Sequence, residues 1–200
     1  KIYRKNTEYH MQSDDLLNLL KKTGAMLEGH FLLTSGRHSD VYIEKFRILE
    51  KPSSLNRICY SMANVVKNEK IDVVLGAAIG GILIAGGVGY HLEKKHIFSE
   101  RIEGKMELRR GFSINKNDRV LIVEDIITTG GSVVELVKLV EQFNGKIVHI
   151  VNLVDRSANG IDFGYPSKAI LNLPSKSWEP NDCPLCKKDI AITQRGRTGK

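Results

Sequence analysis

The chain has 200 residues, of which 42% are hydrophobic and 26% charged, so it can bury one sizeable core and has little room for a second independent domain. No stretch approaches the roughly 20 apolar residues of a membrane span, and the polar, basic start does not resemble a secretory signal, so we expect a cytoplasmic protein without a membrane partner. The net charge of +7 divides into +2 on residues 1–10, +4 on residues 187–200 and +1 on the rest. Charge confined to the ends is typical of solvated tails, and no nucleic-acid partner is expected.

The pattern of the chain predicts one domain with short additions at both ends. Met11 stands directly before a helix-start pattern, so residues 1–10 are expected to be a tag remnant or an upstream extension. The expected division is a single domain over residues 11–186, with a cap element at about 11–50 and a core at about 51–175, followed by a basic tail over 187–200.

The first third of the chain predicts two helices and a hairpin. Ser13 can cap a helix that ends at Gly24. Phe31–Thr34 and Val41–Glu44 flank a Ser-Gly turn and predict a small hairpin-like cap. A second helix opens near Pro52 and carries apolar residues at helical spacing, namely Leu55, Ile58, Cys59, Met62, Val65 and Val66.

Beyond this helix, short apolar runs alternate with helical segments. The runs are Val73–Leu75, Val120–Val123 and Ile147–Val154, and the segments between them are Ile82–His91 and Val133–Phe143. Continuous apolar runs are typical of strands covered on both faces. The order predicts an α/β fold with a doubly wound parallel sheet, whose ligands lie at the carboxyl ends of the strands.

A candidate site follows the second of these strands. Glu124 and Asp125 stand where the strand should end, and adjacent carboxylates beside a buried strand are costly unless a polar ligand or metal shell meets them. Thr128–Ser132 then lead into a helix, where glycines allow close approach and free N–H groups attract anions. This arrangement suits a 5′-phosphate in the loop and ribose hydroxyls on the carboxylates. A turn without a ligand would explain the loop residues but not the paired acids.

Other phosphate-binding motifs are missing from the sequence. It has no GKS or GKT of a P-loop, and no GxGxxG followed by the acidic residue of a dinucleotide site. A nucleotide hydrolase and a dehydrogenase are therefore disfavoured.

The segment VLIVEDIITTGGS (Val120–Ser132) resembles the phosphoribosyl-diphosphate signature of type I phosphoribosyltransferases. Further segments resemble orotate phosphoribosyltransferases, and together they cover most of Met11–Cys186. They are GAMLEGHFLLTSGRHSDVY (Gly24–Tyr42), GAAIGGILIA (Gly76–Ala85), SERIEGKMELRRGF (Ser99–Phe112) and DRS (Asp155–Ser157). The resemblance implies the type I fold with a small N-terminal hood. It also implies transfer of the phosphoribosyl group from phosphoribosyl diphosphate to orotate, which gives orotidine 5′-phosphate in de novo pyrimidine (UMP) synthesis.

The resemblance also implies residue roles. Glu124 and Asp125 would be catalytic and contact the ring hydroxyls, while Thr128 and Arg156 would contact orotate. Arg156 also suits this role because a guanidinium can grip a carboxylate or imide oxygen with two hydrogen bonds, although a surface arginine after a strand is an equally good interpretation. The implied phosphoribosyl-diphosphate site comprises Glu124, Asp125, Ile126, Ile127, Thr128, Thr129, Gly130, Gly131 and Ser132, with Lys105 and Arg101.

The segment 101–110 is rich in cations, namely Arg101, Lys105, Arg109 and Arg110. In the resembled family the matching region is a mobile loop that closes over pyrophosphate and often completes the neighbouring subunit's site. We therefore expect a homodimer with this loop shared across the interface, Lys105 as the catalytic loop cation and Arg101 as the second choice. The best-known branch of the family has a lysine at the position of Thr34 and a Tyr-Lys pair at Ile79 and Gly80, so which groups replace them is open.

The resemblance implies magnesium as the cofactor, held mainly by diphosphate and hydroxyl oxygens of the substrate and by water. No protein metal ligand is expected. Two alternatives remain: a phosphoribosyltransferase for a purine or uracil, which Gly24–Tyr42 disfavours, and a non-catalytic regulator that binds phosphoribosyl diphosphate, which would need a DNA-binding domain or basic face.

The three cysteines do not predict a disulfide framework. Cys59 lies on an apolar helical face and is expected to be buried. Cys183 and Cys186, in CPLC, have the spacing of zinc ligands, but a structural zinc site normally has four ligands and the chain has no second CxxC. The favoured interpretation is two structural thiols in a C-terminal turn, and a zinc shared across a dimer axis is the alternative.

Overall fold

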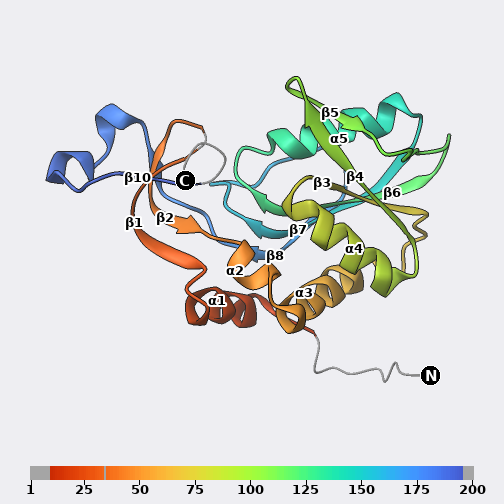
Figure 1. Cartoon of the computed structure of the whole chain (residues 1–200), viewed down its shortest axis with the longest axis horizontal. Coiled ribbons are helices and arrows are strands. Elements are labelled where there is room, and N and C mark those ends of the chain that lie inside the picture. Colours follow the sequence, from red (N-terminus) through yellow and green to blue (C-terminus); the bar gives the residue numbers. More distant parts are fainter. Residues whose placement is uncertain (1–9, 34, 196–200) are drawn as a thin grey trace.

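The chain forms a large and a small β-sheet that lie side by side (Figure 1). The computed structural model describes residues 10–33 and 35–195. Thr34, nearly all of the expected N-terminal extension and the last five residues of the basic tail lie outside the described residues. No helix in the described part is long and apolar enough to cross a membrane.

The large sheet has six strands in the order β5-β4-β3-β6-β7-β8. All neighbours are parallel except the edge pair β4–β5, which is antiparallel. The chain runs from β3 outward to β4 and then returns to β6 on the other side of β3, so the strand order reverses between β3 and β6. Ligands of doubly wound sheets bind at such a point. The strands are β3 (Val73–Ala77), β4 (Lys95–Ile102), β5 (Lys105–Leu108), β6 (Arg119–Ile127), β7 (Lys146–Asp155) and β8 (Ser167–Asn172).

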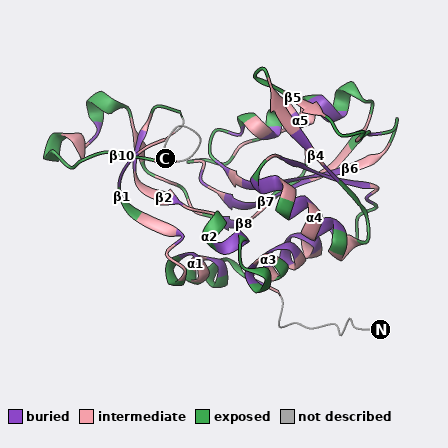
Figure 2. Cartoon of the chain, in the orientation of Figure 1, coloured by how far each residue is buried: buried purple, intermediate pink, exposed green. Residues whose placement is uncertain are grey.

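Helices cover both faces of this sheet, which confirms the predicted doubly wound α/β fold. Along β6, Leu121 and Val123 face one hydrophobic core and Val120 and Ile122 face the other, and all four are fully buried. Figure 2 shows the buried strands between the helical layers. The first core includes residues of α1 (Ser13–Lys22), α2 (Phe46–Leu49), α3 (Pro52–Val65) and α4 (Gly80–Leu92), and the second includes residues of α5 (Gly131–Gln142).

The start of α1 differs from the prediction. Gln12, not Ser13, is the N-cap residue, and its backbone N–H donates to the Asp15 carboxylate at 3.0 Å. Ser13 is the first helical residue, and its hydroxyl donates to the Ile170 carbonyl of β8 at 2.7 Å. The serine therefore attaches the helix to the sheet edge.

The small sheet joins the two ends of the chain, in the order β10-β1-β2-β9. The predicted hairpin is confirmed as β1 (Met26–Leu32) and β2 (His38–Ile43), which are antiparallel. β9 (Ser177–Trp178) and β10 (Thr193–Gln194) come from the C-terminal segment, so part of the expected tail belongs to this sheet.

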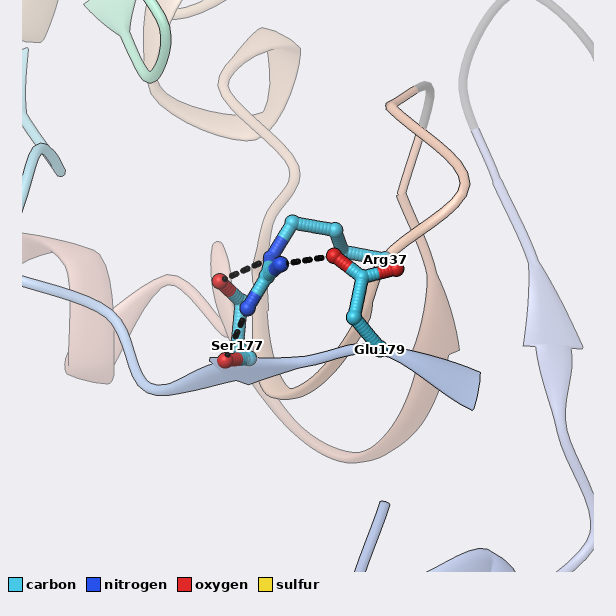
Figure 3. Close-up of polar contacts among 3 residues, drawn as sticks. All are labelled: Arg37, Ser177 and Glu179. Carbon is cyan, nitrogen blue, oxygen red and sulfur yellow. Dashed lines mark hydrogen bonds and ion pairs between the residues drawn. The ribbon is translucent and has the colours of Figure 1, made fainter. Parts of the chain in front are cut away.

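Arg37 fastens the hairpin to the C-terminal segment (Figure 3). Its Nε donates to the Ser177 hydroxyl at 3.0 Å, and its Nη2 donates to the Ser177 carbonyl at 2.8 Å. Its Nη1 forms an ion pair with Glu179. Side chains about 140 positions apart thus close the small sheet.

Candidate active site

Glu124 and Asp125 lie at the carboxyl end of β6, with exposed fractions of only 6% and 3%. Glu124 Oε1 accepts the Asp125 N–H at 2.9 Å, and Asp125 Oδ1 accepts the Ile126 N–H at 2.6 Å. Glu124 Oε2 is buried and has no hydrogen-bond partner among the described residues. Burial, reinforced by the charge of Asp125, raises the pKa of Glu124 to about 8. A buried carboxyl oxygen without a protein partner is a feature of ligand sites, where a hydroxyl or a hydrated cation can meet it.

The second carboxylate has a partner that the sequence did not indicate. Lys45 Nζ lies 2.6 Å from Asp125 Oδ2. A Cβ atom at Gly80 would lie 1.8 Å from the same oxygen and 3.3 Å from Lys45 Cε. Only glycine therefore leaves room for this ion pair, and the lysine side chain lies next to the position at which the best-known family branch has its own lysine.

The loop after β6 forms a pocket at the start of α5. Gly130, the N-cap residue of α5, has a left-handed φ of 77°. Its Cβ would lie 2.8 Å from Ile161 Cδ1 and 2.9 Å from Phe163 Cε1, so glycine is required here for backbone and packing alike. The first-turn amides of the helix lack intrahelical partners and favour an anion. The pocket is lined by Glu124, Ile126, Ile127, Thr128, Thr129, Gly130, Gly131, Ser132 and Val133.

Arg156 lies at the end of β7, beside this loop. Its backbone N–H donates to the Ile127 carbonyl at 2.8 Å, which places it next to Thr128 as the orotate-site prediction requires. The side chain is 5% exposed, so the alternative of a surface arginine is wrong. Nη2 donates to the Val41 carbonyl of β2 at 2.9 Å, Nε is buried without a partner among the described residues, and burial lowers the pKa of the guanidinium. The site therefore holds a cation with a buried, unused donor.

The segment 101–110, for which the resemblance implied a mobile loop, forms much of the β4–β5 hairpin. Ile102 pairs with Lys105, and Glu103 and Gly104 form the turn with positive φ values. A second pocket lies between this hairpin and the β3–α4 turn. Its lining consists of Ala78, Ile79, Glu100, Arg101, Ile102 and Gly104.

Three of the four candidate cations of this hairpin pair with carboxylates of the same chain. Lys105 is exposed, and no ion pair joins it to another residue within 10–33 and 35–195. Arg110 holds the pKa of the Glu100 carboxyl below its usual range. The ion pairs are Arg101–Glu135 (2.8 Å), Arg109–Glu107 (3.7 Å) and Arg110–Glu100 (2.9 Å). Lys105 is thus the cation that can meet an incoming anion without breaking a pair.

Comparison with known proteins assigns the family. The model of the phosphoribosyl transferase domain matches residues 47–185. The orotate phosphoribosyltransferase of Caldicellulosiruptor bescii is 42% identical over 190 residues, which cover 95% of this chain and 100% of the relative. The chain belongs to the orotate phosphoribosyltransferase family.

Solved structures agree with this orotate phosphoribosyltransferase fold. The orotate phosphoribosyltransferase of Aeropyrum pernix has a TM-score of 0.67 and 28% identity, covering 79% of this chain and 93% of that one. The adenine phosphoribosyltransferase of Thermoanaerobacter pseudethanolicus has a TM-score of 0.65 at 17% identity, covering 78% and 99%, and shares the fold alone. The type I fold expected from the sequence is confirmed.

Proposed function

We propose that this chain transfers the 5-phosphoribosyl group from phosphoribosyl diphosphate to orotate, giving orotidine 5′-phosphate and diphosphate in pyrimidine synthesis. One observation supports the proposal beyond family membership: Glu124 presents a buried oxygen, without a donor among the described residues, at a glycine-rich pocket on a helix N-terminus. A ribose 5-phosphate would meet both the carboxylate and the helix N-terminus. Its hydroxyls would donate hydrogen bonds to Glu124, and its phosphate would accept hydrogen bonds from the loop.

The pocket residues divide between the sugar and the base. The 5′-phosphate would accept hydrogen bonds from the amides and hydroxyls of Thr129–Ser132, and the ribose hydroxyls would donate to Glu124. Orotate would lie between Thr128 and Arg156, because no carboxylate in the described part of the chain lies within hydrogen-bond distance of the buried guanidinium and orotate is an anion.

The reaction replaces the bond from the anomeric carbon to the diphosphate oxygen with a bond to a ring nitrogen of orotate. That nitrogen is already acidic, so no strong general base is required. The protein would position the two substrates and exclude water from the site. It would also supply cations that stabilise the departing diphosphate. Lys105 is the first candidate for that cation and Arg101, already paired with Glu135, the second.

The carboxylates fit a magnesium–diphosphate substrate. Glu124 Oε2 is a hard oxygen acceptor to which no described residue donates, and hard oxygens are the ligands that magnesium prefers. Glu124 and Asp125 would hold the hydrated ion through ribose hydroxyls and water, and the substrate would supply most direct ligands. When bound, magnesium neutralises charge that develops on the diphosphate.

We further propose a homodimer in which the β4–β5 hairpin completes the partner's site. Ile79, which lines the pocket beside this hairpin, is 69% exposed, and Leu83, one helical turn further along the chain in α4, is 40% exposed. Exposed apolar side chains beside a site favour a subunit interface. The cytoplasmic location expected from the sequence stays a prediction, which cell fractionation can test.

The test is a base panel. Purified protein is mixed with phosphoribosyl diphosphate, magnesium and either orotate, adenine, guanine or uracil, and loss of the base is followed. We expect loss of orotate alone, and none with Asp125→Asn, which removes the charge that pairs with Lys45. Consumption of adenine, guanine or uracil with orotate untouched would overturn the proposal.

A further inference from the structure

A cluster of two imidazoles and two thiols lies in the small sheet, apart from the pocket after β6. His30 is on β1, His38 is on β2, and Cys183 and Cys186 flank the turn between two short 3-10 helices, Pro180–Asp182 and Cys186–Lys188. One ligand atom from each residue lies within 4.8 Å of all the others. His30, His38 and Cys183 are buried, and Cys186 is partly buried.

The separations suit a tetrahedral ion. Cys183 Sγ and Cys186 Sγ lie 3.5 and 3.7 Å from His30 Nε2, and Cys186 Sγ lies 3.3 Å from His38 Nδ1. Zinc with bonds of about 2.0–2.1 Å to nitrogen and about 2.3 Å to sulfur requires N···S separations of about 3.5 Å. The two nitrogens are 2.9 Å apart, where the same tetrahedron needs about 3.4 Å, so this pair would open slightly around the ion.

The protonation of His30 directs a lone pair into the cluster. Its Nδ1 lies 2.7 Å from the Ile190 carbonyl, which can only accept, so Nδ1 carries the proton. A neutral ring then leaves Nε2 unprotonated, and the three other side chains converge on that single lone pair. One lone pair cannot satisfy three neighbours, two of them buried, whereas one central cation satisfies all four side chains. Carbonyl groups commonly orient metal-binding histidines in this way.

We propose that His30, His38, Cys183 and Cys186 bind a structural zinc ion within one chain. Two thiolates and two imidazoles select zinc over magnesium, and four protein ligands leave no open position for catalysis. The ion would fasten the C-terminal segment to the β1–β2 hairpin, where β9 and β10 contribute only two residues each. The proposal does not depend on the reaction at Glu124.

The first test measures metal in the protein as purified. The full chain is produced without metal-affinity chromatography, and its zinc content is determined by mass spectrometry. We expect about one zinc per chain, and a large loss in Cys183→Ser and in His30→Gln. The matched controls, Cys59→Ala and Lys187→Ala, should keep the metal, because Cys59 is buried in α3 and Lys187 is an exposed neighbour of the ligands.

A second measurement uses the unsubstituted protein, so it holds even where a variant fails to fold. Metal-depleted chain is titrated with cobalt(II), which gives visible bands of tetrahedral geometry and a near-ultraviolet thiolate-to-cobalt band in a site of this kind. Added zinc should abolish both sets of cobalt bands, and the zinc-bound chain should be alkylated at Cys186 more slowly than the metal-depleted chain. A chain that holds no zinc and gives no tetrahedral cobalt spectrum would overturn the proposal, as would full zinc retention in folded Cys183→Ser. An enzyme inactive with orotate that still binds one zinc would count against the proposed reaction alone.

Discussion

At the scale of single residues, Glu124 combines function with a cost in stability. Burial raises its pKa from an ordinary 4.5 to about 8, so the folded chain binds this proton more tightly than the unfolded chain. The penalty is therefore absent below about pH 4.5, grows as pH rises and is complete above about pH 8. A group kept at such a cost is typical of a ligand site.

We accordingly expect Glu124→Gln to lose most activity yet to unfold at a higher temperature at pH 8.5. The rise should be about 2–4 °C for each kcal/mol of unfolding free energy regained, and it should shrink toward pH 5. Differential scanning calorimetry at both pH values measures it. Glu69→Gln, at an exposed position, serves as the control and should leave the melting temperature unchanged at both pH values. An unchanged melting temperature at pH 8.5 would contradict the buried, ionised carboxylate.

Gly80 leaves room for the other carboxylate of the site, that of Asp125. Because a Cβ would lie 1.8 Å from Asp125 Oδ2, Gly80→Ala should displace Asp125 from Lys45. We expect kcat/KM for orotate to fall about 100-fold, as for a reacting group moved by about 1 Å. Gly86→Ala, in the same helix, has no neighbour nearer than 3.9 Å and should keep full activity. Equal activity of the two variants would show that this ion pair is not required.

At the scale of elements, local signals were readable from the sequence and long-range pairings were not. Glu124–Ser132 could be predicted because strand, acids, glycines and helix start are contiguous. Lys45 could not, because a lysine after a strand carries no signal until folding brings it to Asp125, 80 positions away. Likewise CPLC showed two zinc-type ligands, while His30 lies more than 150 positions before them. The two-residue strands β9 and β10 have no periodicity to detect.

The Arg37 contacts permit a prediction for the small sheet. Arg37→Ala removes hydrogen bonds to Ser177 and a partly exposed ion pair with Glu179, which contributes little. We expect the melting temperature to fall by about 2–4 °C, the equivalent of about 1 kcal/mol. Trypsin should cut at Lys187 or Lys188 faster than in wild type.

Arg109→Ala is the matched control, because this arginine is exposed and its nearest carboxylate partner is 3.7 Å away. Both variants are compared by thermal unfolding and timed proteolysis. Equal cleavage rates would mean that Arg37 does not hold the C-terminal segment in place.

At the scale of the whole molecule, the distribution of charge and of exposed apolar side chains bears on which partner the chain binds. The net charge is concentrated at the two ends and leaves the body nearly neutral, and the expectation of no nucleic-acid partner stays a prediction. Apolar side chains are instead exposed at Ile79, beside the hairpin that carries Lys105, and at Leu83, one helical turn further along the chain. A second copy of the chain is the partner that these features favour.

A mixing experiment tests whether that copy shares its hairpin. Lys105→Ala and Asp125→Asn should each inactivate the enzyme, because one removes the loop cation and the other a site carboxylate. If the hairpin acts on the partner's site, a mixed dimer has one site with both residues intact. Random reassortment makes half of the dimers mixed, so about a quarter of wild-type activity should return. Recovery is measured as orotate loss after the variants are mixed under dissociating conditions and reassociated. Each variant treated alone should stay inactive, and a mixture that also stays inactive despite proven exchange would place Lys105 in its own chain's site.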